Sequence, residues 1–242
     1  KIIVIETNSE ICNDLKNKDI NCYNNLDFFT GKYNDLIIVF AVKPQVLEEV
    51  LINLKKIEIK NAVYLSIVAG IRVDFLTKYL GEDKYIYRAM PNIPAEVSEG
   101  ITAIYKKNNA LEQNSIFVEG LMNSVGKSIW VECEKDIDIV TAVSGSGPAY
   151  FFYLTECLTK ICNSMGLNKD LSQTLSIQTI IGSSELLKVT KKSPQTLRNN
   201  VTSKGGTTEA AINTLMKNKI FEEVIRNAVL AAKKRSEELS KN

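Results

Sequence analysis

Short apolar segments alternate with amphipathic helical segments over the first 132 residues, and this alternation limits the possible folds more than any other feature. Residues 36–42 are continuously apolar, which is typical of a strand covered on both faces. Pro44 ends this segment, and residues 45–55 then carry their apolar side chains on one helical face. Strand, helix and strand at this spacing predict an α/β domain with a parallel sheet.

The remaining elements of this region follow the same rules. Further strands are expected at residues 2–6, 62–68, 85–90, 101–105 and 128–132. Further helices are expected at 9–16, capped by Asn8 or Ser9, at 73–80, ended by Gly81, and at about 110–125.

The pattern changes after residue 132, where only helical periodicity remains. Helices are expected over about 137–165, 170–190, 208–217 and 221–239. We therefore predict two domains, an α/β domain over 1–133 and an all-helical domain over 134–242. The helix near 147–165 is apolar around most of its circumference, so it should be buried inside its domain or against another subunit.

Composition excludes several functions. The chain of 242 residues has a formal net charge of +2, which argues against a nucleic-acid partner. No apolar run reaches the roughly 18 residues of a membrane span, and residues 2–6 resemble a strand rather than a signal peptide. Five scattered cysteines and no histidine predict a reduced, cytoplasmic protein with no metal site and no histidine-based catalysis.

Residues 201–212 combine paired glycines with hydroxyl side chains directly before a helical segment. Gly205 and Gly206 allow close backbone approach, and Thr207 and Thr208 stand where the helix should begin. The first N–H groups of a helix lack partners and carry partial positive charge. This segment is therefore either a site for a small anion such as a carboxylate or an ordinary glycine turn with a threonine cap.

Three other segments have the composition of ligand-binding loops. Residues 41–44 and 90–94 each follow an expected strand, and ligands of open α/β sheets bind at the carboxyl ends of strands. Residues 144–148, Ser-Gly-Ser-Gly-Pro, should break a helix and expose new N–H groups. The alternatives are a surface lysine at Lys43, a plain proline turn at 90–94, and a helix kink at 144–148.

Together, the four segments resemble the pyrroline-5-carboxylate reductase family. The similar pieces are Ala-Val-Lys-Pro-Gln from 41, Met-Pro-Asn-Ile-Pro from 90, Thr-Ala-Val-Ser-Gly-Ser-Gly-Pro-Ala-Tyr from 141 and Val-Thr-Ser-Lys-Gly-Gly-Thr-Thr from 201. The resemblance implies a Rossmann-like N-terminal domain and an all-α C-terminal dimerisation domain. It also implies self-association into dimers or rings of dimers such as decamers. The implied reaction is hydride transfer from NADPH or NADH to the C=N carbon of 1-pyrroline-5-carboxylate, giving L-proline.

The resemblance also implies the site residues. The cofactor would lie along Ala41, Val42, Lys43, Pro44, Pro91 and Asn92, and its ribose against Glu6, Thr7 and Asn8. The substrate carboxylate would bind Ser203, Gly205, Gly206, Thr207 and Thr208, with Thr208 reaching the ring nitrogen as the catalytic residue. Glu6 would accept from a ribose 2′-hydroxyl and repel a 2′-phosphate, which favours NAD, while Thr7, Asn8 and Ser9 could still donate to a phosphate.

Two features depart from the family pattern. The first strand and the Gly-x-Gly-x-x-Gly loop of a dinucleotide fold are missing from the sequence, so we expect a chain that is truncated or incompletely recorded. Lys204 replaces the proline that is common before the paired glycines, a tolerated change that adds positive charge. The alternatives are a structural or regulatory homologue without the cofactor loop, or a related imine reductase or β-hydroxyacid dehydrogenase, which residues 144–147 disfavour.

Overall fold

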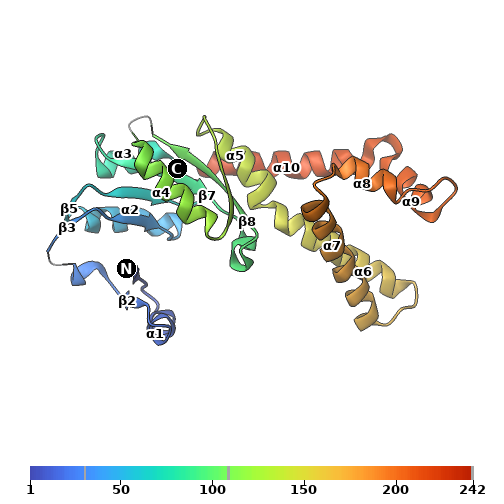
Figure 1. Ribbon diagram of the computed structural model, residues 1–242, viewed down its shortest axis with the longest axis horizontal. Helices are drawn as coiled ribbons and strands as arrows, with labels where there is room; N and C mark the ends of the chain where they lie inside the picture. Colours follow the sequence, from blue (N-terminus) through green and yellow to red (C-terminus); the bar gives the residue numbers. More distant parts are fainter. Residues whose placement is uncertain (30, 108–109, 241–242) are drawn as a thin grey trace. The chain divides into compact units, whose positions relative to one another are not determined.

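The computed structural model describes residues 1–29, 31–107 and 110–240, and the chain divides into two compact units (Figure 1). The first unit comprises Lys1–Asp138 together with Ser236–Asn242, and the second comprises Ile139–Arg235. The two units therefore meet in the sequence between Asp138 and Ile139. This point is close to 133/134, where the sequence analysis places the domain boundary, and that boundary stays a prediction. Within the described ranges, no helix has both the length and the apolar character needed to cross a bilayer.

The first unit is built on a five-stranded sheet in the order β4-β6-β7-β8-β9. Its strands are β4 (Ile37–Phe40), β6 (Val63–Ser66), β7 (Tyr85–Met90), β8 (Gly100–Lys106) and β9 (Gly126–Trp130). All five lie in segments that the sequence predicts as strands, with bounds shifted by up to two residues. Parallel pairing of β4 with β6 and of β6 with β7 is confirmed by their registers.

The predicted parallel sheet has one antiparallel pair, at β8. This strand pairs antiparallel with β7, so that Ala89 lies opposite Ile104. The connection between the two strands contains only the short 3₁₀ helix η2 (Ile93–Val97), whereas a parallel partner needs a longer crossover. The strand β9 is parallel to β8 because α4 (Glu112–Asn123) provides such a crossover.

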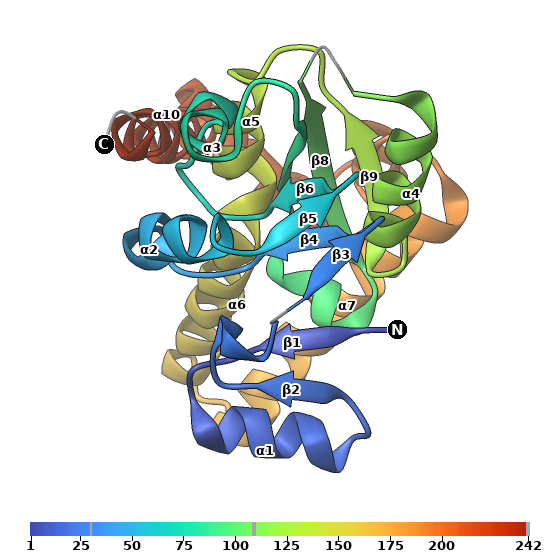
Figure 2. The ribbon, with the colours of Figure 1, turned by 90° about the vertical axis from the view of Figure 1, so that its left-hand side faces the viewer.

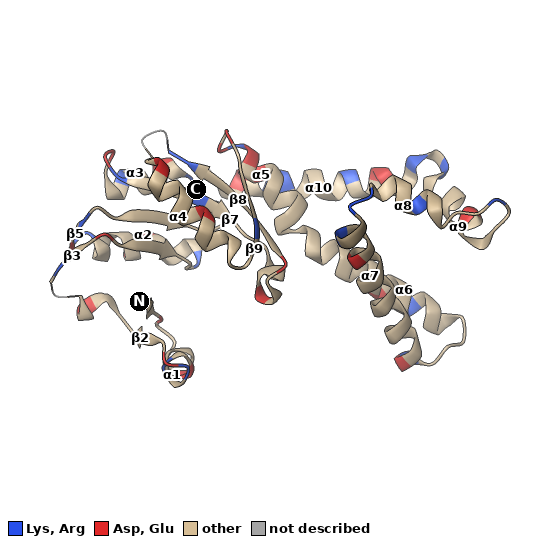
Figure 3. Ribbon diagram, in the orientation of Figure 1, with Lys and Arg blue, Asp and Glu red and all other residues tan. Residues whose placement is uncertain are grey.

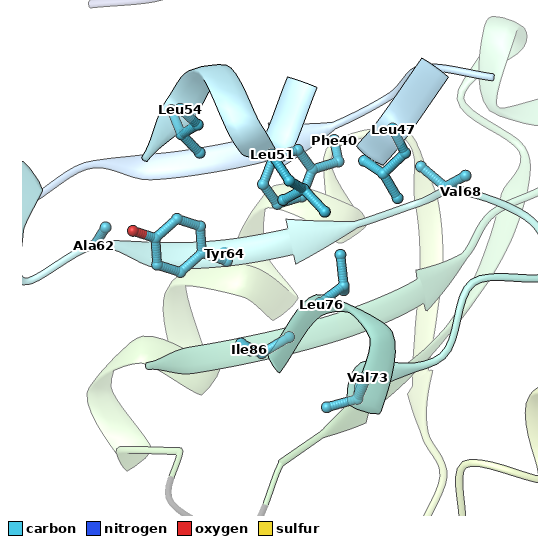
Figure 4. Close-up of a cluster of buried hydrophobic side chains, with 10 residues drawn as sticks. All are labelled: Phe40, Leu47, Leu51, Leu54, Ala62, Tyr64, Val68, Val73, Leu76 and Ile86. Atoms are coloured by element: carbon cyan, nitrogen blue, oxygen red, sulfur yellow. The ribbon is translucent and has the colours of Figure 1, made fainter. Parts of the chain in front are cut away.

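Helices cover both faces of this sheet. Figure 2 shows α2 (Pro44–Leu54) and α3 (Val73–Leu80) on one side and α4 on the other. Successive residues of a strand face opposite sides, and accordingly Tyr64 packs under α2 and α3 while Leu65 packs under α4. Figure 4 shows the first of these two cores, which is formed by Phe40, Leu47, Leu51, Leu54, Ala62, Tyr64, Val68, Val73, Leu76 and Ile86.

Two small parallel ladders in this unit were predicted only in part. One pairs β1 (Ile3–Ile5), which was expected, with β2 (Asn21–Tyr23), and α1 (Ser9–Asn17) connects them. The other pairs β3 (Lys32–Asn34) with β5 (Glu58–Lys60). The strands β2, β3 and β5 have three residues each, which is too short for an alternating pattern to identify them.

A buried polar cluster ties the ends of the first unit together. Arg88 of β7 is 1% exposed, and its Nη1 donates to Glu134 Oε1 at 3.0 Å. The same carboxylate oxygen accepts from the Val73 N–H at the start of α3, at 2.8 Å. Asp138, also 1% exposed, accepts from Arg72 Nη2 at 2.8 Å and from Ser236 Oγ at 2.7 Å. These bonds compensate for removing the charges from water.

The second unit is helical, as predicted. Its helices include α6 (Gly147–Ser164), α7 (Lys169–Thr190), α8 (Pro194–Asn200), α9 (Thr207–Met216), the short η4 (Lys217–Lys219) and α10 (Ile220–Leu239), whose last turn lies in the first unit. The expected helix at 137–165 is interrupted at Ser144–Pro148, where α5 (Asp136–Val140) leads into a π-helical turn (Thr141–Gly145) and α6 then begins with Pro148 in its first turn. The sequence prediction missed α8, which has only seven residues.

The apolar circumference of α6 is largely exposed within the single chain. Phe152 is 66% exposed, and Met165, the C-cap residue directly after the helix, is 80% exposed. The charged residues of this helix are Glu156 and Lys160, and the rest of its ribbon is tan in Figure 3. A soluble monomer rarely exposes such a continuous apolar surface.

Candidate functional site

The first group of candidate residues follows the strands at one edge of the sheet. Phe40 lies opposite Ser66 in the parallel register, and Ser66 lies opposite Arg88. The loops after β4 and β7 therefore leave the sheet at the same edge, and the Ile67 N–H donates to the Phe40 carbonyl at 3.0 Å. This edge is where open α/β sheets bind their ligands.

Residues Ala41–Pro44 connect β4 to α2 at this edge. Lys43 is the N-cap of α2 in an extended conformation, as the following proline requires. No side chain accepts a hydrogen bond from the first N–H groups of this helix. These groups and the positive end of the helix dipole lie at the same edge as the exposed Lys43. The arrangement suits a negatively charged group.

Asn92, in the loop after β7, has a structural contact as well as a candidate role. Its Oδ1 accepts from the Ile101 N–H at 2.9 Å, which fixes the loop against the start of β8. Pro91 and Asn92 are half-buried at the carboxyl end of β7. The loop is therefore rigid, and the structure brings it to the same edge as Ala41–Pro44.

Glu6 directly follows β1 and is held by the backbone around it. Its Oε1 accepts from the Asn8 N–H at 2.7 Å, and the Asn24 side chain donates to its carbonyl at 3.1 Å. Asn8 caps α1, since its Oδ1 accepts from the N–H groups of Glu10 and Ile11. A carboxylate held at the end of a strand can accept hydrogen bonds from the two hydroxyl groups of a ribose, as the predicted preference for NAD requires.

The second group of candidate residues forms a tight turn in the helical unit. The Gly206 N–H donates to the Ser203 carbonyl at 3.0 Å, and Gly205 has a φ of +76°. These two features define a type II turn over residues 203–206, with the positive φ at its third position. A side chain at position 205 would be strained there, which explains one of the paired glycines.

The helix α9 begins directly after this turn. Gly206 is its N-cap, and no side chain makes a capping hydrogen bond to it. Thr207 and Thr208 occupy its first two positions; Thr207 is exposed and Thr208 is half-buried. The result is a helix start with hydroxyl groups beside it, which is the geometry of a small-anion site.

Glu209 was missed by the sequence analysis. Its Oε2 accepts from the Gly205 N–H at 2.7 Å. Glu209 lies three residues after the N-cap, as in a capping box, but the N-cap is Gly206 rather than Ser or Thr, so the sequence carries no capping-box signature that would have identified it. The carboxylate thus bonds to the turn itself.

The two groups of residues belong to different units of the chain. Residues Ala41–Pro44 and Pro91–Asn92 share one edge of the sheet, while Glu6–Asn8 follow the separate ladder of β1. Residues Ser203–Thr208 form a continuous turn and helix start. The functional roles of these residues stay predictions.

Comparison with known proteins gives consistent results. A family profile described as pyrroline-5-carboxylate reductase dimerisation matches residues 134–239. A pyrroline-5-carboxylate reductase from Arabidopsis thaliana is 39% identical over 206 residues, covering 85% of this chain and 74% of that protein.

Solved structures agree with these sequence matches. A pyrroline-5-carboxylate reductase from Coxiella burnetii superposes with a TM-score of 0.87 at 32% identity, covering 100% of this chain and 89% of that one. A Plasmodium falciparum pyrroline carboxylate reductase with NADP bound superposes with a TM-score of 0.76 at 29% identity, covering 99% and 98%. On this similarity in sequence and fold along both units, the chain belongs to the pyrroline-5-carboxylate reductase family.

Proposed function

We propose that the protein reduces 1-pyrroline-5-carboxylate to L-proline with NADPH or NADH. The observation that carries the proposal is the 39% identity to a pyrroline-5-carboxylate reductase over 85% of the chain. The Plasmodium relative with NADP bound supports a nicotinamide cofactor.

The reaction suits a chain without histidine. Bound NADPH or NADH supplies the hydride. The substrate's protonated imine accepts it at the C=N carbon, the π electrons move to nitrogen, and a secondary amine results. Because the substrate ring already carries the proton on nitrogen, the protein needs no strong base; its main tasks are alignment and exclusion of water.

The turn and helix start at 203–208 are the proposed carboxylate site. Free N–H groups at the start of α9 and the hydroxyls of Thr207 and Thr208 can donate to the substrate carboxylate. The reduced carbon becomes a CH₂ group, so the configuration of proline is that of the carbon bearing the carboxylate. A site that fixes this carboxylate would therefore select the L enantiomer of the substrate.

Thr208 is the proposed catalytic residue. It is half-buried at the second position of α9, and its hydroxyl can both donate and accept. We assign it to the ring nitrogen, where it would hold the proton while the nitrogen changes from iminium to amine.

The edge formed by Ala41–Pro44 and Pro91–Asn92 is the proposed cofactor site. Two loops at the carboxyl ends of β4 and β7 and the uncapped start of α2 beside Lys43 support this assignment, because dinucleotides bind at the carboxyl ends of strands in open α/β sheets. Glu6, held by the Asn8 N–H, would face the ribose and favour NADH over NADPH. Residues 1–242 contain no Gly-x-Gly-x-x-Gly segment, so we assign no group to the pyrophosphate.

Self-association is the second part of the proposal. The exposed apolar surface of α6 lies within the region that matches the family's dimerisation profile. We propose that α6 is buried against a second copy of the chain, and that dimers assemble further into a ring such as a decamer. Light scattering coupled to gel filtration tests this, with a monomer as the contradicting result.

The activity is tested by following NADPH and NADH absorbance in the presence and absence of 1-pyrroline-5-carboxylate. We expect oxidation that depends on the substrate and an equal amount of L-proline by chiral chromatography. Oxidation without proline, or no oxidation with either cofactor, would contradict the proposed function.

A further inference from the structure

The turn over residues 203–206 has two possible backbone forms, and they place opposite polar groups on its surface. Type I and type II turns share the same hydrogen bond between their first and fourth residues. In a type I turn the second residue has a ψ of about −30° and the third a φ of about −90°. In a type II turn these angles are about +120° and about +80°. These opposed changes rotate the central peptide by about half a turn. In this turn the central peptide consists of the Lys204 carbonyl and the Gly205 N–H.

The structure holds the type II form through a side chain outside the turn. Glu209 Oε2 accepts from the Gly205 N–H, the donor of the central peptide, at 2.7 Å. Rotation to the type I form would turn this N–H away and break the bond. Glu209 is well placed for this role because it lies in the first turn of α9, where the helix dipole stabilises a carboxylate.

The sequence of the turn explains why such a bond is needed. Proline at the second position presets φ and favours type I and type II turns, but it does not choose α-helical over extended ψ by itself. This chain has Lys204 at the second position, so not even φ is preset there. Gly205 is the most flexible residue type.

We propose that Glu209 is a positioning residue that keeps this turn in the type II form and so keeps the start of α9 ready for the substrate carboxylate. The inference rests on the proposed function. Glu209 acts on the turn and not on the substrate, because its carboxylate already accepts from the Gly205 N–H. Without it, part of the population would present the Lys204 carbonyl, which repels an anion.

Removal of the side chain should affect substrate binding selectively. Loss of one charge-assisted hydrogen bond would lower the fraction of the competent turn, and the KM for 1-pyrroline-5-carboxylate of Glu209→Ala would rise about 10-fold. The kcat and the KM for the cofactor should change less than about 3-fold, because chemistry in the competent fraction is unaltered. Glu209→Gln keeps an oxygen acceptor and should restore most of the affinity.

Lys204→Pro separates the stiffness of the turn from the choice of its form. Proline presets φ at the second position of both forms and does not choose between them, so Glu209→Ala should still raise the KM about 10-fold in this background. Comparison within the Lys204→Pro background removes the effect of the lysine charge. Glu223→Ala is the matched control, since it removes an acidic residue from the first turn of α10 in the same unit.

Hydrogen exchange of the Gly205 amide gives a readout that does not depend on activity. We expect protection in the wild type and in Glu209→Gln, and faster exchange in Glu209→Ala, at unchanged circular dichroism. An unprotected Gly205 amide in the wild type would overturn the inference even if the protein had no reductase activity.

The kinetic outcomes separate the two proposals. An inactive wild-type protein would contradict the proposed function, and the exchange result would then decide the role of Glu209 in the turn. An active wild type with the same substrate KM in Glu209→Ala, or no restoration in Glu209→Gln, would overturn the inference alone.

Discussion

Glu134→Ala should strongly destabilise the first unit, because it breaks an ion pair whose arginine is buried. The substitution removes the carboxylate that pairs with Arg88 Nη1 at 3.0 Å and accepts from the Val73 N–H at 2.8 Å. The Arg88 side chain is 1% exposed, and that of Glu134 is 15% exposed. The variant would leave a guanidinium in the core without its ion-pair partner and an N–H at the start of α3 without its acceptor.

The size of the effect follows from this burial. Breaking a buried ion pair by removing one partner costs about 3–5 kcal/mol. The partial exposure of Glu134 lets water reach the vacated position, which favours the lower end, and the lost bond to Val73 adds about 1 kcal/mol. We expect a loss of about 4 kcal/mol in the free energy of unfolding of this unit. Replacing both partners, in Arg88→Met with Glu134→Leu, should recover more than half of the loss, because no charge then remains buried.

Urea unfolding followed by tryptophan fluorescence measures this loss. The chain has one tryptophan, Trp130, which ends β9 in the first unit and packs edge-on against Tyr87. Glu58→Ala is the matched control, because Lys32 and Glu58 also pair at 3.0 Å but with side chains 75% and 49% exposed. That exposed pair should contribute less than about 1 kcal/mol. Equal losses in Glu134→Ala and Glu58→Ala would refute the argument from burial.

Four further changes test other parts of the account. Thr208→Ala should lower kcat by up to ~100-fold if the hydroxyl holds the proton at the ring nitrogen. Thr214→Ala on the same helix should leave kcat unchanged. Equal kcat values in Thr208→Ala and the wild type would contradict the assignment of Thr208 as the catalytic residue. Glu6→Ser should raise the ratio of NADPH to NADH use about 10-fold by removing a charge facing the ribose, and an unchanged ratio would contradict that placement. Phe152→Glu should dissociate the oligomer, because a charge would replace an apolar contact, and an unchanged mass in light scattering would place the interface elsewhere. Burial raises the pKa of Tyr87 above its usual 10.0. The free energy of unfolding should therefore fall as the pH rises from about 10 through the higher folded-state pKa. Tyr87→Phe should reduce this fall, and an equal fall in both proteins would contradict the prediction.

Elements with a clear period and clear ends were predictable from the sequence. The expected helix 73–80 and the expected strand 85–90 have the same bounds in the structure, because Gly81 and Pro91 end them. Helix α1 was also predicted, since Asn8 has the side chain of an N-cap. The helix break at Ser144–Pro148 followed from the poor helix propensity of glycine.

Features that depend on distant residues were not predictable in this way. The direction of β8 is set by the short connection through η2, and an isolated strand pattern carries no direction. In the sequence, Arg88 is a charged residue within an otherwise apolar strand, and its partner Glu134 lies 46 residues later. Glu209 was missed because the N-cap before it is a glycine and gives no capping-box signature, although its carboxylate bonds to the turn. The sequence predicted that the candidate loops follow strands, but their common edge required the register of those strands.

Deuterium transfer to the substrate from NADPH or NADH that carries deuterium at both C4 positions tests the central claim most directly. The account predicts L-proline with one deuterium on the ring CH₂ beside nitrogen, formed in a one-to-one ratio with oxidised cofactor when the full-length protein is supplied with 1-pyrroline-5-carboxylate. Proline without deuterium, or cofactor oxidation with no labelled proline, would contradict hydride transfer to the C=N carbon.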